Sequence, residues 1–327
     1  MGLNEKFFKS AETGGGSGLF NTVLYTGSGS SGTNEITGAG FEPDLIWIKR
    51  RPFFSAGNPG MVDSLRGNQI LFTNLTLAQL APSNATISMT NDGFDISTYG
   101  ASWANQNNIS YVAWCFKAGG AAVSNTDGDI TSQVSANVAN GFSIVKWSGD
   151  GSDMDIGHGL DAAPEMVIKK NFISSVDWMV DISVIDGSWD YLKLNTTVSK
   201  TNHTYVQSPT STIFNTMGAN YNSSGMIAYC FHSVAGVSKV GGYTGGSGAT
   251  VNTGFEPSWV MIKRTNSTSD WFIYDNVRGE DKYLLANTNG AENTLDNVDF
   301  TATGFNLKAS NASLNVTGGI YIYYAIA

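Results

Sequence analysis

Short apolar runs separated by Gly, Ser, Asn and Asp recur along the whole chain. The runs are rich in Val, Ile, Trp, Tyr and Phe, which is the pattern of β-strands joined by tight turns. Three of them, DLIWIK, EMVIK and SWVMIK, are apolar almost without a break, so we expect central strands covered on both sides. A proline precedes each run, which suits the start of a strand. We expect helix only in part of Thr73–Leu80.

These three runs belong to one repeated motif. It reads GFEPDLIWIKR at 40–50, GFEPSWVMIKR at 254–264 and, more loosely, GLDAAPEMVIKK at 159–170. A glycine turn, a proline and a buried strand describe scaffold rather than a catalytic signature. A lysine closes each copy, and a pairing with acidic residues of the following segment is expected for Lys49, Lys169 and Lys263 with carboxylates such as Asp63 and Asp275.

The repeat extends beyond the motif and has a period of roughly 90 residues, which is the size of a domain. Each copy closes on an apolar run: YVAWCFK, MIAYCFH or YIYYAIA. The middle copy diverges, because VIDG replaces SLRG or NVRG and the DGF step is missing. We predict an all-β protein of three tandem β-sandwich units, of jelly-roll or lectin-like type, at residues 21–120, 121–236 and 237–327.

A short segment, residues 1–20, precedes the first unit. It contains NEKFFKS and a flexible GGGSG hinge at 14–18. It is either a disordered tail or an anchoring peptide that orders only against a larger partner. In the anchoring interpretation, Phe7 and Phe8 are the apolar side chains that bind the partner.

Charge narrows the classes of partner. The 327 residues include 18 basic and 27 acidic side chains, a net charge of −9. Nucleic acids and anionic membranes bind clusters of Lys and Arg, so we expect neither as a partner. No apolar stretch approaches the roughly 20 residues that span a bilayer, so membrane insertion is not expected.

The two cysteines occupy matching places in the closing runs of the first two units. Equivalent buried positions in different units rarely meet, so we expect Cys115 and Cys230 to be free core thiols. This agrees with folding in a reducing cytoplasm.

Candidate chemistry is sparse. The histidines are His158, His203 and His232, and none of them has a partner at metal-ligand spacing. We therefore predict no catalytic, cofactor-binding or metal-binding residue.

One acidic cluster stands out, GDGSDMD, with carboxylates at Asp150, Asp153 and Asp155. Close carboxylates bind Ca²⁺ or hydrolyse a glycan. The corresponding turns of the other units, GSGSSG and GGSGAT, carry no carboxylate, so a plain turn is favoured. Two aromatic residues, Trp103 and Trp189, fit either sugar contact or a core position.

The combination YTG…GFEPDLIWIKRR…SLRG…DGFDI…YVAWCFKAGG resembles a repeat domain of unknown function. That domain occurs in structural proteins of tailed phages, notably short-tailed phages of marine bacteria and cyanobacteria. The resemblance covers nearly the whole chain from Leu19.

The resemblance implies a non-enzymatic virion protein on the particle surface, assembled in the host cytoplasm and attached through its N-terminal segment to capsid or tail proteins. A capsid decoration protein is favoured. A tail fibre or receptor-binding appendage that recognises host surface glycan is the alternative, and a polysaccharide depolymerase is third. A homotrimer and a single pseudo-trimeric chain both stay open.

Overall fold

The computed structural model describes residues 18–29, 32–52, 57–81, 86–97, 102–203, 206–218, 220–246, 248–308 and 313–327. The helices among these residues are one turn of α-helix, α1 (Ser102–Asn105), and one 3₁₀ turn, η1 (Val138–Asn140). The expected helix within 73–80 is wrong, because this segment forms turns after a strand and a single bridge between Leu80 and Ile70. No helix of the described residues has the length and apolarity that a bilayer crossing requires.

The rest of the regular structure is β, which confirms the predicted all-β class. The described residues form six sheets, and we group them as three sheet pairs, each with one large and one small sheet. In the first sheet pair the large sheet has the order β1 (Phe20–Thr26), β8 (Ser110–Phe116), β3 (Leu45–Arg50), β4 (Gly60–Asp63) and β5 (Leu71–Phe72). Its small sheet has the order β2 (Asn34–Thr37), β7 (Gly93–Ile96) and β6 (Ile87–Thr90).

The large sheet of the second sheet pair has the order β16 (Thr201–Asn202), β15 (Asp190–Lys193), β14 (Met179–Ile182), β13 (Met166–Asn171), β18 (Met226–Phe231), β11 (Phe142–Trp147), β10 (Ser132–Asn137) and β9 (Val123–Asn125). Its small sheet pairs β12 (Met154–Gly157) with β17 (Ile213–Thr216). The small-residue segment 117–141, between the closing run of the first unit and β11, supplies β9 and β10.

The third large sheet has the order β19 (Ser238–Thr244), β27 (Ile320–Ile326), β21 (Trp259–Arg264), β22 (Trp271–Asp275), β23 (Lys282–Leu285) and β24 (Asn293–Thr294). Its small sheet has the order β20 (Thr250–Asn252), β26 (Gly304–Leu307) and β25 (Val298–Thr301). One order recurs in every large sheet: the opening strand, the closing strand, the motif strand, then the next strands along the chain.

The motif strands β3, β13 and β21 are central, as their apolar runs predict. Every residue of β3 and β13 is buried, as are all but the last of β21. Alternate side chains point to opposite faces, and each face meets a different core. Ile46 and Ile48 pack between the two sheets of the first pair, whereas Leu45 and Trp47 point to the other side.

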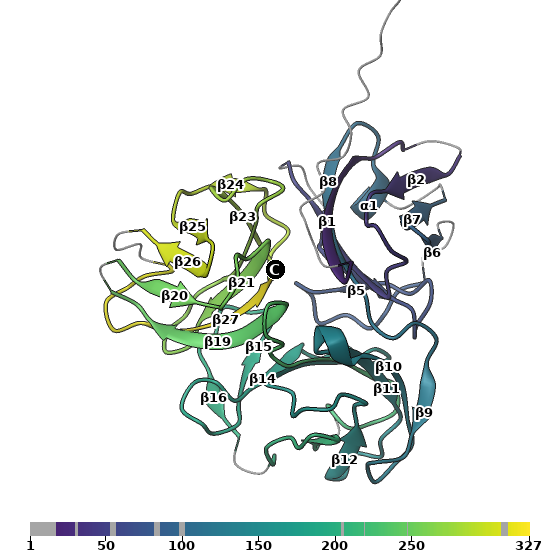
Figure 1. Ribbon diagram of the computed structural model, residues 1–327. Helices are drawn as coiled ribbons and strands as arrows, with labels where there is room; N and C mark the ends of the chain where they lie inside the picture. Colours follow the sequence, from purple (N-terminus) through teal and green to yellow (C-terminus); the bar gives the residue numbers. More distant parts are fainter. Residues whose placement is uncertain are drawn as a thin grey trace, which may run out of the picture.

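That other side is a core shared by all three sheet pairs. The large sheets lie around a common centre, with their inner faces turned toward it (Figure 1). Five tryptophans, contributed by all three sheet pairs, are at most 2% exposed in this core: Trp47, Trp114, Trp178, Trp259 and Trp271. Burying a large apolar side chain contributes about 1.5–3 kcal/mol, so the shared core is a major part of the stability.

Between the sheets of each pair lies a separate, smaller core. Cys115 and Cys230 belong to two of these cores and are free and buried, as predicted. Burial raises the pKa of both thiols, that of Cys230 to about 12. Trp103 and Trp189 also lie in these cores at 6% and 4% exposure. The core interpretation is therefore confirmed for both side chains, and the interpretation as sugar contacts is wrong.

Candidate functional site: three junctions and a central hollow

Each sheet pair is joined to a neighbour by a buried lysine. The lysines occupy the same register, because Lys49, Lys170 and Lys263 lie opposite Val112, Ile227 and Ile322 of the closing strands. Each ammonium group donates to a backbone carbonyl of another sheet pair: Lys49 to Thr288, Lys170 to Thr76 and Lys263 to Thr197. The first pair thus reaches the third, the third reaches the second and the second reaches the first. The ring of junctions is closed.

This register corrects two expectations about the motif. Lys170, not Lys169, is the counterpart of Lys49, and counting from the proline two residues before each strand identifies it. Lys169 points to the opposite face and pairs with Asp181 at 2.5 Å. The expected pairing of motif lysines with acidic residues of the following segment is therefore confirmed for Lys169, but it is wrong for Asp63 and Asp275, because arginines hold those carboxylates.

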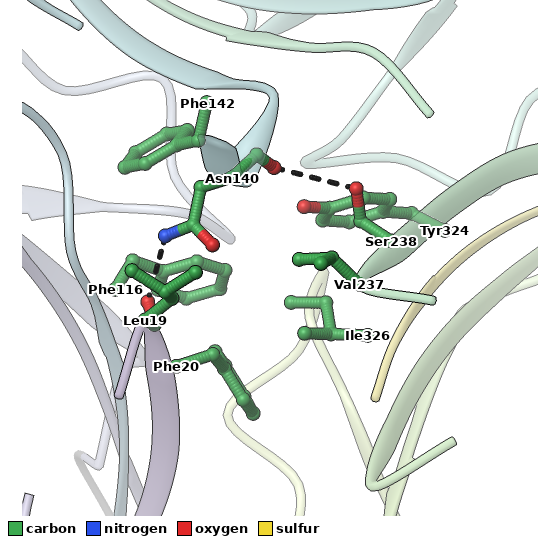
Figure 2. A pocket seen from close by; sticks show the side chains of 9 residues that line it. All are labelled: Leu19, Phe20, Phe116, Asn140, Phe142, Val237, Ser238, Tyr324 and Ile326. Carbon is green, nitrogen blue, oxygen red and sulfur yellow. Dashed lines mark hydrogen bonds between the residues drawn. The ribbon is translucent and has the colours of Figure 1, made fainter. Parts of the chain in front are cut away.

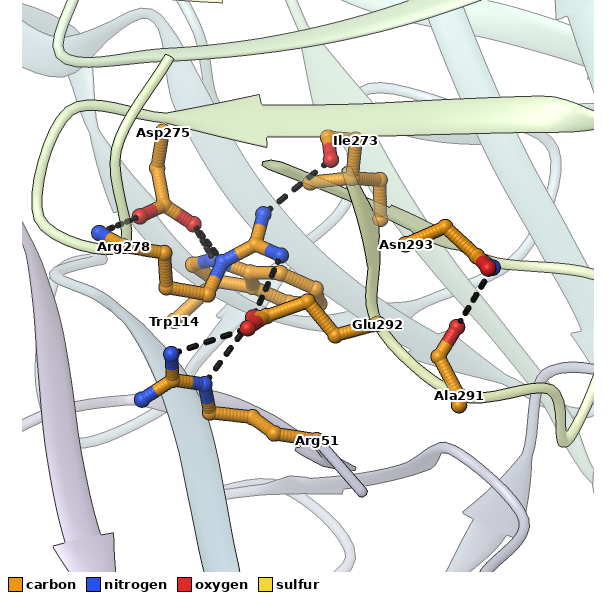
Figure 3. Close-up of polar contacts among 8 residues, drawn as sticks. All are labelled: Arg51, Trp114, Ile273, Asp275, Arg278, Ala291, Glu292 and Asn293. Carbon is orange, nitrogen blue, oxygen red and sulfur yellow. Dashed lines mark hydrogen bonds and ion pairs between the residues drawn. The ribbon is translucent and has the colours of Figure 1, made fainter. Parts of the chain in front are cut away.

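At the junction of the first and third sheet pairs lies an ion-pair network with a buried half, Asp275 and Arg278, and a partly exposed half, Glu292 and Arg51 (Figure 3). Arg278 donates from Nε to Asp275 at 2.6 Å, and neither side chain is exposed. Trp114 of the first pair donates to the same carboxylate at 3.0 Å. The carboxylate of Glu292 accepts hydrogen bonds from Arg278 on one side and, at 2.9 Å, from Arg51 of the first pair on the other. The guanidinium of Arg51 holds the pKa of Glu292 low despite the opposing effect of burial.

The junction of the first and second pairs repeats the core of this network. Arg66 lies 2.6 Å from Asp63, again three residues away, and both side chains are buried. Tyr229 of the second pair donates its hydroxyl to Asp63 at 2.7 Å. Desolvation followed by the charge of Asp63 raises the pKa of Tyr229, so the hydroxyl remains a donor.

The third junction, between the second and third sheet pairs, lacks this buried aspartate–arginine pair. Where Asp63 faces Leu45 and Asp275 faces Trp259, Ile182 faces Met166. The carboxylate has moved one position to Asp181, on the other face of the strand, and VIDG supplies no arginine. The signal for the buried pairs was therefore present in SLRG and NVRG, as an arginine three residues after an aspartate.

Burial makes the junction lysines sensitive to pH. Desolvation, together with the charge of Arg278, lowers the pKa of Lys49 to about 7. Desolvation lowers the pKa of Lys170 and Lys263 to about 8. Between these values and the ordinary lysine pKa, the unfolded chain holds protons that the folded chain has released.

We therefore expect stability to rise with pH across this window. Relative to Lys49→Met, the free energy of unfolding of the wild type should increase by about 2–3 kcal/mol between about pH 7 and pH 9.5. Urea denaturation at the two pH values measures this difference. The difference in free energy of unfolding between the wild type and the control Lys308→Met, which removes an exposed lysine, should not change between these pH values. An unchanged difference for Lys49→Met would contradict protonation-linked stability at this junction.

A small hollow lies at one end of the shared core and is lined by all three sheet pairs (Figure 2). Its volume of about 10 Å³ is the space of roughly one water molecule. The lining is mostly apolar: Leu19, Phe20, Phe116, Asn140, Phe142, Val237, Ser238, Tyr324 and Ile326. We call it the central hollow.

Asn140 ties the sheet pairs together at this hollow. Its amide donates to the carbonyls of Leu19 and Lys117 at 3.1 and 2.8 Å, and its own carbonyl accepts from Ser238 at 3.3 Å. The turn that presents Asn140 ends at Gly141, whose φ of 62° and close approach to the His232 carbonyl leave no room for a side chain. The start of the first sheet pair and both connecting segments therefore meet at one point.

The predicted anchoring residues, Phe7 and Phe8, lie outside the described residues. What the structure places is the point at which the N-terminal segment joins the body. Leu19 lines the central hollow, and Phe20 packs against Phe116 and Trp259 at ring distances of 4.8 and 5.9 Å. The segment thus joins the body where the three sheet pairs meet, at the start of β1, the edge strand of its own large sheet.

The acidic turn does not converge on a cation site. Asp150 accepts from the backbone and hydroxyl of Ser152, and Asp155 accepts from Asn215 at 3.0 Å. Hydrogen bonds from Ser152 lower the pKa of Asp150, as expected for a turn cap. Among the described residues, no group of three His, Cys, Asp or Glu side chains has the geometry of a metal site.

The histidines serve different parts of the second sheet pair. His158 is buried and bonds the Thr210 carbonyl at 3.2 Å, and burial lowers its pKa to about 4. His203 bonds Asp181 at 3.0 Å. His232 bonds the Ser233 carbonyl at 3.0 Å, beside the segment that leads to the central hollow.

Comparison with protein families places the whole body in one group. The model of a domain of unknown function, DUF7483, matches residues 15–327. The chain belongs to the DUF7483 family. No curated protein and no solved structure matches it. The DUF7483 match spans all three sheet pairs and the central hollow, so the family unit is the closed body rather than one sandwich.

Proposed function

We propose that the protein is a non-enzymatic structural component of a tailed-phage particle, exposed on the particle surface and attached through residues 1–20. The observation that carries this proposal is the central hollow. Leu19 enters the body where all three sheet pairs meet. A segment that joins the body there and binds a larger partner would hold all three sheet pairs at a common point. The resemblance of the repeats to phage structural proteins supports the same assignment.

The proposal includes an origin for the architecture. The three sheet pairs are copies of one unit, at about 21–120, 121–236 and 237–327, and the closed ring of junctions makes one chain pseudo-trimeric. Such a body fits a threefold or sixfold position of a capsid, which favours a decoration protein. In a closed heterologous ring, each copy uses one surface toward the next copy and a different surface toward the previous one.

A receptor-binding appendage on the tail is the second candidate. The observation that favours it is a polar groove on the second sheet pair, which lies away from the central hollow and is described below. In either case the partners are capsid or tail proteins, and particles assemble in the host cytoplasm.

Deletion of residues 1–18 tests the attachment. We expect the truncated protein to keep its β circular dichroism and its cooperative unfolding, because Leu19 and all sheets remain. It should fail to sediment with particles that bind the full chain. Phe7→Ala with Phe8→Ala should weaken sedimentation in the same direction. Undiminished binding of the truncated protein would refute attachment through this segment.

Immunogold labelling of intact particles distinguishes the two positions. Label over the head supports decoration, and label confined to the tail supports the appendage. Unlabelled particles would refute the virion assignment altogether. Copy number gives a second reading, because a decoration protein is present in hundreds of copies and a tail appendage in tens.

A further inference from the structure

A polar groove of about 450 Å³ lies where the second sheet pair meets the loop after β5 of the first. Its walls include Thr76, Asp177, Tyr191, Lys193, Asn220 and Tyr221. The groove and the central hollow lie toward opposite ends of the second large sheet. The groove residue Met179 faces Lys169 near one end of β13, whereas Phe231, which stacks on the hollow residue Phe142, faces Met166 at the other.

The aromatic wall of the groove is held in place from behind. The ring of Tyr191 lies 4.7 Å from that of His203, which bonds the buried carboxylate of Asp181 at 3.0 Å. Asp181 is paired in turn with the buried Lys169 at 2.5 Å. This series of contacts exists only because the middle copy carries the carboxylate of Asp181 on the outer face of β14. The divergence that removes a buried junction thus builds a support for Tyr191.

Two hydroxyl groups of the groove are available to a ligand. Among the described residues, neither the Tyr191 hydroxyl nor the Tyr221 hydroxyl has a hydrogen-bond partner. Burial, and then the charge of Asp177, raise the pKa of Tyr221, so its hydroxyl stays protonated. Both tyrosines are half-buried and line the groove.

A fixed polar pair completes the lining. Asp177 lies 2.6 Å from Lys193, and their side chains are 26% and 33% exposed. Asn195 also donates to Asp177 at 2.8 Å, which fixes the carboxylate. The pair offers an acceptor and a donor side by side while its net charge is zero.

We propose that this groove binds a segment of a neutral oligosaccharide. Half-exposed aromatic rings match the apolar faces of sugar rings, and adjacent donors and acceptors match vicinal hydroxyls. The Asp177–Lys193 pair is neutral, and the nearby Lys170 is buried with its ammonium group donating to three backbone carbonyls, so the described lining offers no cluster of exposed cations to a phosphate or a polyanion. Asp177 is the single carboxylate among the described residues of the lining, and glycoside hydrolysis ordinarily needs two, so we propose binding without cleavage. The site goes beyond particle attachment, and only its outward orientation rests on the proposed attachment.

Binding of the full chain to an array of neutral hexose and N-acetylhexosamine oligosaccharides tests the proposal, followed by calorimetry with the strongest binder. Tyr191→Ala and, separately, Asp177→Asn should each weaken binding at least tenfold. The matched control is Tyr283→Ala, because Tyr283 holds the same place in the third sheet pair but lies outside the groove. That control should bind as the wild type does.

Three results would overturn the saccharide site: no oligosaccharide bound at millimolar concentration, equal binding by Tyr191→Ala, or equal losses in Tyr283→Ala. Preference for anionic polysaccharides would also overturn it. Near-ultraviolet circular dichroism checks that each variant is folded, and Asp177→Asn keeps the shape of the side chain. Particle sedimentation of Tyr191→Ala should be normal. Failure of attachment and failure of sugar binding are therefore separate outcomes.

Discussion

Residues 19–120 produced alone are expected not to fold. They contain every strand of the first sheet pair, but the inner face of its large sheet is covered only by the other two pairs. Leaving five large side chains of that face exposed forfeits about 7–15 kcal/mol, at about 1.5–3 kcal/mol each. The side chains are Trp47, Met61, Leu71, Trp114 and Phe116. A typical domain has a total stability of about 5–15 kcal/mol, so the loss removes most or all of it.

Near-ultraviolet circular dichroism and urea denaturation of the isolated segment measure this. We expect no near-ultraviolet signal and no cooperative transition, while the full chain unfolds in one transition. A segment that unfolds cooperatively by itself would show that the small core of each sheet pair suffices. It would also contradict a shared core as the main source of stability.

Arg278→Ala is expected to destabilise the protein by about 3–5 kcal/mol, the usual cost of leaving a buried charge without its partner. The substitution strands Asp275, which is fully buried, and removes the link through Glu292 to the first sheet pair. The loss should be measured as a lower midpoint of urea denaturation with an unchanged slope.

The double variant Asp275→Leu with Arg278→Met tests the physical reason. Replacing both partners by apolar residues removes the uncompensated charge, so part of the lost stability should return. The matched control Arg264→Ala removes an exposed hydrogen bond to Asn266 and should cost less than about 1 kcal/mol. Equal losses in the single and double variants would mean that the arginine acts through packing, not charge.

The sequence predicts the strands best where burial is complete. DLIWIK and SWVMIK are apolar almost throughout, and only a strand covered on both faces accommodates them. Cys115 and Cys230 follow from the same logic. The helix expected within 73–80 failed because that segment supports a junction instead, with Gln79 bonding the Phe172 carbonyl of the second sheet pair.

The residues that form the central hollow and the groove could not be predicted from the sequence in the same way. Asn140 lies in VANG, which indicates only a turn, and its partners Leu19 and Ser238 are 121 and 98 residues away. The tyrosines of the groove belong to one sheet pair while Thr76 belongs to another, so no local pattern brings them together. The arginine of SLRG, three residues after an aspartate, indicates an ion pair. Its burial depends on contact with the second sheet pair, which the sequence does not show.

The position of β27 within its sheet sets the order of events during synthesis. This strand lies between β19 and β21, and Tyr324 and Ile326 close the shared core around the central hollow. Neither the third sheet nor the common core is complete until residues 320–326 have left the ribosome. Until then the two earlier sheet pairs present uncovered tryptophans to the solvent. A ribosome that pauses before this last strand leaves the nascent chain open to chaperones and proteases.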